Sequence, residues 1–129
     1  MLFDTHTNLM WYPEHLSDEF VEFAWEAKKA KMKLSEDVYF AGSDVDQNNA
    51  FDSRPEQLLE ATADMDRVIV FGIKAPFCGI NADQELIASF VNEHPDRFIA
   101  LSSVALPYPD LAAEQLEYAV TQLGARGAA

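Results

Sequence analysis

The chain has 129 residues, of which 49% are hydrophobic and 24% charged, so it is long enough for one globular domain and is not disordered in composition. Acidic residues outnumber basic ones by 22 to 9, and the net charge of -13 repels phosphate backbones and anionic lipid, which argues against nucleic acid and membrane partners. No apolar run approaches the roughly 18 residues of a membrane helix. The chain has a single cysteine, and its first residues lack the basic stretch that opens a secretory signal; both features predict a cytoplasmic location.

The first part of the sequence predicts a short strand and then a helix. Residues 2–7 form the strand, which runs into polar residues. Ser17 is a good helix N-cap, and the acidic residues directly after it suit the positive end of the helix dipole. One apolar face follows at helical spacing, formed by Phe20, Phe23, Ala24 and Ala27.

The next segment has no regular pattern and predicts a long connection. Residues 35–52 indicate an irregular surface excursion. A short helix then begins at Ser53-Arg54-Pro55-Glu56, where Ser and Glu form a capping box and Pro occupies the first turn. The sequence therefore predicts one domain over residues 1–129, with a long insertion after the first strand at about residues 8–66.

From residue 67 onward the elements become regular. Residues 67–73 and 98–104 are apolar on both faces, which is typical of buried strands in a parallel sheet. A helix is capped at residues 81–84 and ends at His94-Pro95, and another runs from residue 109 to a natural stop at Gly124. Residues 126–129 predict the start of a further strand. The expected buried stripes of the two helices are Leu86, Ile87, Phe90 and Val91, and Leu116, Ala119, Val120 and Leu123.

These strand–helix units recur at about 30 residues, which is the size of a βαβ unit. The fold class is therefore α/β. Two architectures are built from such repeated strand–helix units: a doubly wound open sheet and a (β/α)₈ barrel. Right-handed crossovers place the helices on one face of the sheet. A complete barrel needs roughly 200 residues or more, so a barrel-like chain of this length holds about three βα units plus the start of a fourth strand.

Polar side chains at the end of the first strand are the main candidates for chemistry. His6 and Asn8 are two residues apart, so on a regular strand they project together and could hold one metal ion. Histidine is a common zinc ligand, whereas an Asn amide is a hard oxygen donor that binds zinc weakly. The alternative interpretation is that both side chains satisfy backbone groups at the strand end.

The segment Phe3-Asp4-Thr5-His6-Thr7-Asn8 resembles the Ile-Asp-x-His-x-His opening of the amidohydrolase superfamily. Two later segments, His94-Pro95-Asp96-Arg97-Phe98-Ile99 and Leu123-Gly124-Ala125-Arg126-Gly127, occur in the order and spacing of its amidohydrolase-related branch, as does the apolar run 68–72. That branch includes enzymes similar to aminocarboxymuconate-semialdehyde decarboxylase. The resemblance covers nearly the whole chain.

The resemblance implies a metal-dependent (β/α)₈ barrel of which this chain is the N-terminal part. In the family the two first-strand histidines bind a divalent ion, usually zinc, and ligands from later strands complete the site. His6 occupies the first of these positions, and Asn8 occupies the second but departs from the pattern. The further ligands are expected beyond Ala129. The long insertion after the first strand contains three aromatic residues, Trp11, Tyr12 and Phe40. They either line a pocket for a small-molecule substrate or pack this insertion against the barrel.

The functional prediction is an N-terminal portion of an amidohydrolase-related, metal-dependent hydrolase or decarboxylase that is not catalytically competent alone. The alternative is a small, non-catalytic α/β module for binding or interaction. Because helices on one face leave the other face of the sheet bare, the sequence also predicts that the isolated chain self-associates through that face or remains partly molten.

Overall fold

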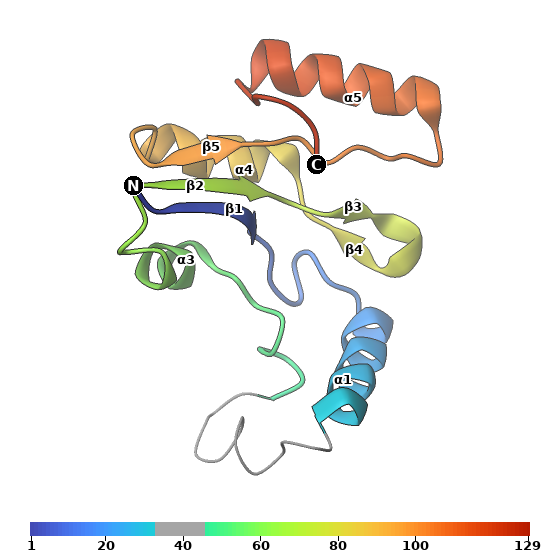
Figure 1. Cartoon of the computed structure of the whole chain (residues 1–129). Helices are drawn as coiled ribbons and strands as arrows, with labels where there is room; N and C mark the ends of the chain where they lie inside the picture. Colours follow the sequence, from blue (N-terminus) through green and yellow to red (C-terminus); the bar gives the residue numbers. More distant parts are fainter. Residues whose placement is uncertain (33–45) are drawn as a thin grey trace.

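The computed structural model of the chain describes residues 1–32 and 46–129. It confirms a mixed α/β fold, shown in Figure 1. Most of the predicted connection at residues 35–52, including Phe40, lies outside the described residues. The elements in chain order are β1 (Phe3–Asn8), α1 (Asp18–Met32), α3 (Pro55–Ala61), β2 (Arg67–Phe71), β3 (Lys74–Ala75), the 3₁₀ turn η1 (Pro76–Cys78), β4 (Ile80–Asn81), α4 (Gln84–Glu93), β5 (Phe98–Ala100) and α5 (Pro109–Gln122).

The main sheet is parallel, and its spatial order β1-β2-β5 follows the order of the chain. Residues 126–129 continue this series beside β5, because the backbone N–H of Ser102 donates to Gly127 at 2.8 Å and that of Ala129 donates to Ser102 at 2.8 Å. An isolated parallel bridge between Ser102 and Ala128 thus lies where the sequence predicts the start of a fourth strand. Doubly wound sheets reverse their strand order at a switch point, and the described strands show no such reversal.

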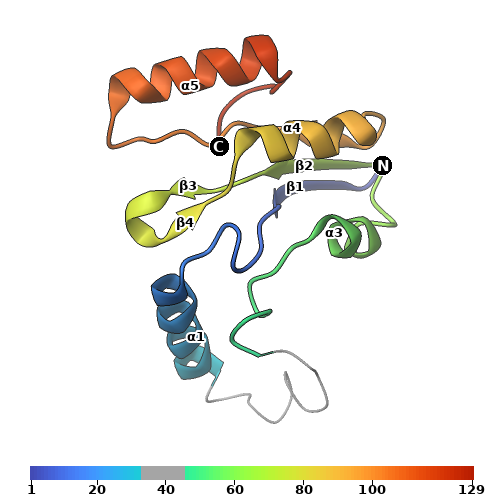
Figure 2. The ribbon, with the colours of Figure 1, turned by 180° about the vertical axis from the view of Figure 1, so that it is seen from behind.

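The buried core lies on one face of this sheet. Val68 and Val70 of β2 are completely buried, and their register partners on β5 are Phe98 and Ala100. Leu58 of α3, together with Ile87 and Phe90 of α4, packs into the same cluster. The prediction that helices after the strands share one face is confirmed for α3 and α4, and Figure 2 views the sheet from the side that carries α4.

The opposite face of the sheet is less covered. Alternation along the strand turns Ile69 away from the core, and its register partner on β5 is Ile99. Both side chains are only half-buried, as is Leu101, while Phe3 of β1 is 47% exposed. In Figure 1, none of the described helices lies in front of the three strands on this face. Apolar side chains thus remain accessible where the sheet lacks a covering layer.

A second, smaller cluster joins α1 to a hairpin that the sequence did not predict. β3 and β4 pair antiparallel across η1, and the chain before α1 pairs with β4 through an isolated bridge between Leu16 and Ile80. Val21 of α1 is 1% exposed within this cluster, whereas Phe23 is 74% exposed and Ala27 is also exposed. The prediction that Phe23 and Ala27 belong to the buried face of this helix is therefore wrong. The helix packs against the hairpin through the side that carries Val21.

Three smaller differences concern element boundaries. The two long strands end at Phe71 and Ala100, earlier than predicted, since the chain leaves the sheet there. The N-cap of α3 is Arg54 instead of Ser53, and its backbone N–H donates to the Gln57 side chain at 2.9 Å. Val120 of α5 is 46% exposed and does not belong to that helix's buried stripe. No helix among the described residues is long and apolar enough to cross a membrane.

Gly79 holds the hairpin against α1 and provides a stability test. Its φ of +77° lies in the left-handed region, and an added Cβ would lie 2.2 Å from the Ser17 Oγ. Gly124 has a similar φ of +75° but has open space around it. We expect Gly79→Ala to lower the free energy of unfolding by more than the roughly 1 kcal/mol expected for Gly124→Ala, because strain and a steric clash combine. Urea denaturation measures both, and equal losses would contradict this packing.

Candidate metal and substrate site at the strand ends

The carboxyl end of β1 brings the two predicted metal ligands to one place. Asn8 is the register partner of Phe71 on β2, and the His6 ring meets the Phe71 ring edge-on with 5.0 Å between centroids. His6 and Asn8 therefore flank the same aromatic side chain, on the face of the sheet opposite the core. In barrels, the carboxyl ends of the strands form the catalytic end.

Asp4 shapes this strand end. The register of β1 against β2 shifts between Asp4 and Thr7. One carboxylate oxygen of Asp4 accepts the His6 backbone N–H at 3.0 Å, and the other accepts the Thr7 hydroxyl at 2.8 Å. Both bonds are local, and short acidic side chains commonly make such bonds to residues two or three positions ahead. Asp4 thus acts as a positioning residue for His6. The Asp-x-His spacing was the sequence signal for this role.

The donor set partly fits a divalent cation. The side-chain oxygen of Asn8 is buried and has no hydrogen-bond partner, although such buried acceptors are nearly always paired. The His6 imidazole is exposed and contacts Phe71, the register partner of Asn8. A cation would satisfy the Asn8 oxygen, and His6 would supply a nitrogen ligand. Within residues 1–32 and 46–129, no three His, Cys, Asp or Glu side chains are grouped closely enough to hold a metal, so these residues offer only part of a coordination shell.

The other two histidines lie away from this pair. His15 is buried, its Nδ1 accepts the Trp11 backbone N–H at 3.3 Å, and its ring packs edge-on against that indole. His94 follows α4 and contacts the rings of Phe90 and Phe98. His94 also precedes β5 and so lies at the amino end of the sheet.

Trp11 and Tyr12 take part in packing around Arg54. The Arg54 guanidinium lies over the Trp11 ring at 5.4 Å and donates to the Tyr12 carbonyl at 3.1 Å. It also pairs with Asp52, whose side chain is only 6% exposed. Trp11 packs against the main core and Tyr12 against the smaller cluster. These contacts agree with the interpretation that the two aromatics pack the connection, and contact with a substrate stays a prediction.

The Tyr12 hydroxyl donates to the Asp18 carboxylate at 2.9 Å. This hydrogen bond, together with the negative charge of Asp18, raises the pKa of Tyr12 above its ordinary value because both favour the protonated phenol. Tyr12 is therefore neutral at physiological pH and can donate but not act as a base.

A cavity of about 350 Å³ lies where β2 and β5 end. It is bounded by Ile73 and the following hairpin residues through Cys78, by residues 103–108 and by Ala129. The Phe77 and Tyr108 rings face each other across 5.9 Å between centroids. Cavities of this size, apolar with a few polar groups, are typical of small-molecule sites. It shares the carboxyl end of the sheet with His6 and Asn8.

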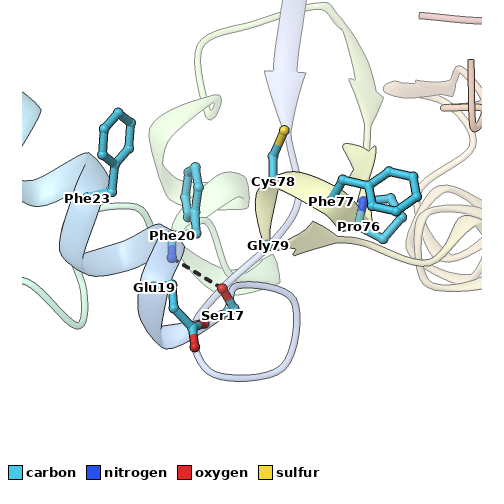
Figure 3. A pocket seen from close by; sticks show the side chains of 8 residues that line it. All are labelled: Ser17, Glu19, Phe20, Phe23, Pro76, Phe77, Cys78 and Gly79. Atoms are coloured by element: carbon cyan, nitrogen blue, oxygen red, sulfur yellow. Dashed lines mark hydrogen bonds between the residues drawn. The ribbon is translucent and has the colours of Figure 1, made fainter. Parts of the chain in front are cut away.

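A larger hollow of about 630 Å³ lies between α1 and the hairpin, and Figure 3 shows its lining. Phe20 and Phe23 stand on the α1 side, and Pro76 and Phe77 stand on the hairpin side. Its one ionisable group besides the Cys78 thiol is Glu19. Because this hollow lacks converging polar groups, the cavity at the strand ends is the better candidate for binding and chemistry.

Comparisons with known proteins agree with the fold. No family model matches the sequence, and no curated protein matches it significantly. Solved structures of 5-carboxyvanillate decarboxylase from Novosphingobium aromaticivorans match with a TM-score of 0.55 and 17% identity, over 99% of this chain and 41% or 40% of theirs. Dihydroxybenzoic acid decarboxylase from Polaromonas sp. JS666 matches with a TM-score of 0.57 and 15% identity, over 98% of this chain and 37% of its own.

Both neighbours are decarboxylases. The first was crystallised with manganese and 4-hydroxy-3-methoxy-5-nitrobenzoic acid, and the second with manganese and the inhibitor 2-nitroresorcinol. At these identities the likeness shows the fold alone. The chain spans about 40% of the length of the solved structures that it matches.

Proposed function

We propose that this chain is the N-terminal part of a metal-dependent (β/α)₈ enzyme of the amidohydrolase-related type, and that the enzyme decarboxylates a small aromatic acid. The observation that carries the proposal is that His6 contacts Phe71 while Asn8, whose side-chain oxygen has no partner, is in register with that same residue, at the carboxyl end of a sequentially ordered parallel sheet. The fold shared with two manganese-containing decarboxylases supports it.

The donor set favours manganese over the zinc expected from the family resemblance. An amide oxygen is a hard ligand, and such ligands suit Mn²⁺ and Mg²⁺ better than Zn²⁺, which prefers nitrogen and thiolate. His6 and Asn8 would hold the ion, and Asp4 would orient the strand segment that carries His6. When bound, the metal supplies a positive charge that binds and polarises the acid or carbonyl group of the substrate.

The surroundings favour decarboxylation over hydrolysis. Loss of CO₂ leaves an electron pair on carbon that must then take a proton, and the Tyr108 hydroxyl in the cavity lining is a group that can donate it. The described residues that line the cavity at the strand ends are mostly apolar, and none of them is Asp or Glu. Hydrolysis would instead need a general base beside a bound water, and the described lining offers no Asp, Glu or His side chain for that role.

The alternative function is a non-catalytic binding module. It draws support from the incomplete ligand set among the described residues, which contain no cluster of three acidic, His or Cys side chains. Such a module would use its half-bare sheet face for a protein partner and would show no specific metal binding. Metal titration therefore distinguishes the two functions.

The test uses the three histidines as internal reporters. Mn²⁺ is paramagnetic and broadens NMR signals of nearby groups, so a sub-stoichiometric titration should broaden the His6 ring signals first. We expect His15 and His94 to stay sharp, since one is buried against Trp11 and the other lies at the amino end of the sheet. His6→Ala should weaken Mn²⁺ binding at least about tenfold, because one of two protein ligands is lost.

His94→Ala is the matched control, and it should leave Mn²⁺ affinity unchanged. Asn8→Leu removes the amide oxygen at similar volume, and it should weaken Mn²⁺ binding as His6→Ala does. Uniform broadening of all three histidines, or no broadening below millimolar Mn²⁺, would overturn the proposed metal site and favour the binding module.

A further inference from the structure

The cavity at the strand ends has an unusual charge for this protein. The chain carries 22 acidic residues against 9 basic ones, yet none of the residues that line this cavity is Asp or Glu. Among the described residues of the lining, Lys74 has the one charged side chain, and Ala129, the last residue of this sequence, adds the carboxylate of the chain end. In a protein whose net charge of -13 repels anions, this cavity is a place where a bound anion meets a cation instead.

The surrounding structure holds Lys74 at this position. Its backbone N–H donates to the Ser103 hydroxyl at 2.9 Å, and the Ser103 carbonyl accepts the Gln84 side chain at 2.8 Å. These bonds tie the start of β3 to the segment after β5 and to the first turn of α4. Antiparallel pairing of Lys74 with Asn81 fixes it from the other side. Within the described part of the chain, the Lys74 ammonium has no ion-pair or hydrogen-bond partner.

Lys74 follows Phe71 by three residues on the same chain segment. At about 3.3 Å per residue in extended chain, their Cα atoms lie roughly 10 Å apart at most. Phe71 contacts His6, so the cavity and the candidate metal ligands belong to one end of the sheet. The aromatic rings of Phe77 and Tyr108 add flat apolar surface to the same cavity.

We infer that Lys74 determines specificity for a carboxylate on the ligand, whose ring occupies the cavity against Phe77 and Tyr108. This inference rests on the proposed function and extends it by naming the residue that selects acids over neutral analogues. The ammonium forms a charge-assisted hydrogen bond with the carboxylate, and the apolar lining reduces competition from water. Lys74 is a binding residue in this scheme and takes no part in bond breaking.

The experiment compares 4-hydroxy-3-methoxybenzoate with its methyl ester, which has the same ring but no charge. Both are titrated without metal into the whole chain while the backbone amide signals of Lys74 and Ser103 are followed by NMR. We expect the acid to bind about tenfold more tightly than the ester, as one charge-assisted hydrogen bond allows. The preference should shrink at high salt.

Lys74→Met keeps the length and apolar stem of the side chain and should remove the preference for the acid. Lys74→Arg retains the charge and should keep it. Lys31→Met, on an exposed position of α1, is the matched control and should change nothing. Circular dichroism verifies that each variant folds. If Lys74→Met does not fold, the comparison of Lys74→Arg with the wild-type chain decides the result.

A preference for the acid that survives in Lys74→Met, or a wild-type chain that binds neither compound, overturns the inference. Because the titration uses no metal, these results are independent of the His6 signals. A cavity that selects the acid through Lys74 while Mn²⁺ leaves His6 unaffected would support the inference and refute the metal-dependent enzyme. If Mn²⁺ specifically broadens the His6 signals while substitution of Lys74 leaves the preference for the acid unchanged, the metal-dependent enzyme is supported and the inference is refuted.

Discussion

The isolated chain is expected to self-associate through the less covered face of its sheet. Ile69 and Ile99 are register partners on that face and are only half-buried, whereas Val68 and Val70 on the other face are fully buried. Each large apolar side chain left in water forfeits about 1.5–3 kcal/mol. Several together approach the 5–15 kcal/mol that stabilises a whole domain. Sedimentation should therefore show dimers or larger species, and a dye that reports exposed apolar surface should bind to the monomer.

Ile99→Lys tests which face is responsible. A lysine in the centre of the less covered face should shift the chain toward a folded monomer, because its ammonium stays in water when the face is open. Val70→Lys is the matched control on the neighbouring strand. There the charge would be buried among Leu58, Ile87 and Phe90, and the free energy of unfolding should fall by about 4 kcal/mol or more.

The opposite result has a clear meaning. A sharp wild-type monomer that melts cooperatively and binds no dye would contradict the partial barrel, and it would favour a self-contained module. Solubility alone does not discriminate, since the net charge of -13 keeps small oligomers in solution.

Asn8→His is expected to convert a poor zinc site into a better one. The imidazole would replace a hard amide oxygen next to His6, and the pair would match the two first-strand histidines of the family that the sequence resembles. Zinc affinity should rise about tenfold or more by calorimetry, while Mn²⁺ affinity should change less because that ion accepts oxygen and nitrogen.

Thr7→His is the matched control on the same strand. Thr7 is the register partner of Val70, so its side chain belongs to the opposite face from Asn8. This variant adds an imidazole on the opposite face and removes the Thr7 hydroxyl that Asp4 accepts, so zinc affinity should not rise. If Asn8→His gives no gain, or if Thr7→His gives an equal one, the proposed geometry of His6 and Asn8 is wrong.

Local patterns in the sequence were sufficient for the types and the order of the longer elements, though not for the β3–β4 hairpin. The strands around Val70 and Ile99 are short apolar runs, which are favourable only when both faces of a strand are buried. Gly124 was expected just after the last helix, and it has the left-handed φ that a residue without Cβ adopts most easily. Such signals depend on neighbours within a few positions, so they are available before any tertiary contact is known.

The sequence also determined part of the candidate site. His6 and Asn8 were identified by their spacing on one strand, and the structure places both beside Phe71. Phe71 itself is more than 60 positions away, and no local pattern links it to His6. The unpartnered oxygen of Asn8 is likewise a property of the folded chain, since it depends on which donors reach that point.

Only the tertiary structure decided which surfaces meet. Helical periodicity marks an apolar stripe but does not say which part of it faces a partner, so Phe23 was expected inside although Val21 is the buried residue. The hairpin β3–β4 was hidden because two-residue strands carry too few positions for a period. The role proposed for Lys74 depends on residues 103–108, which complete a cavity whose described lining contains no Asp or Glu. Cavities and their charge are formed by segments distant in sequence, and for that reason the tertiary structure alone revealed them.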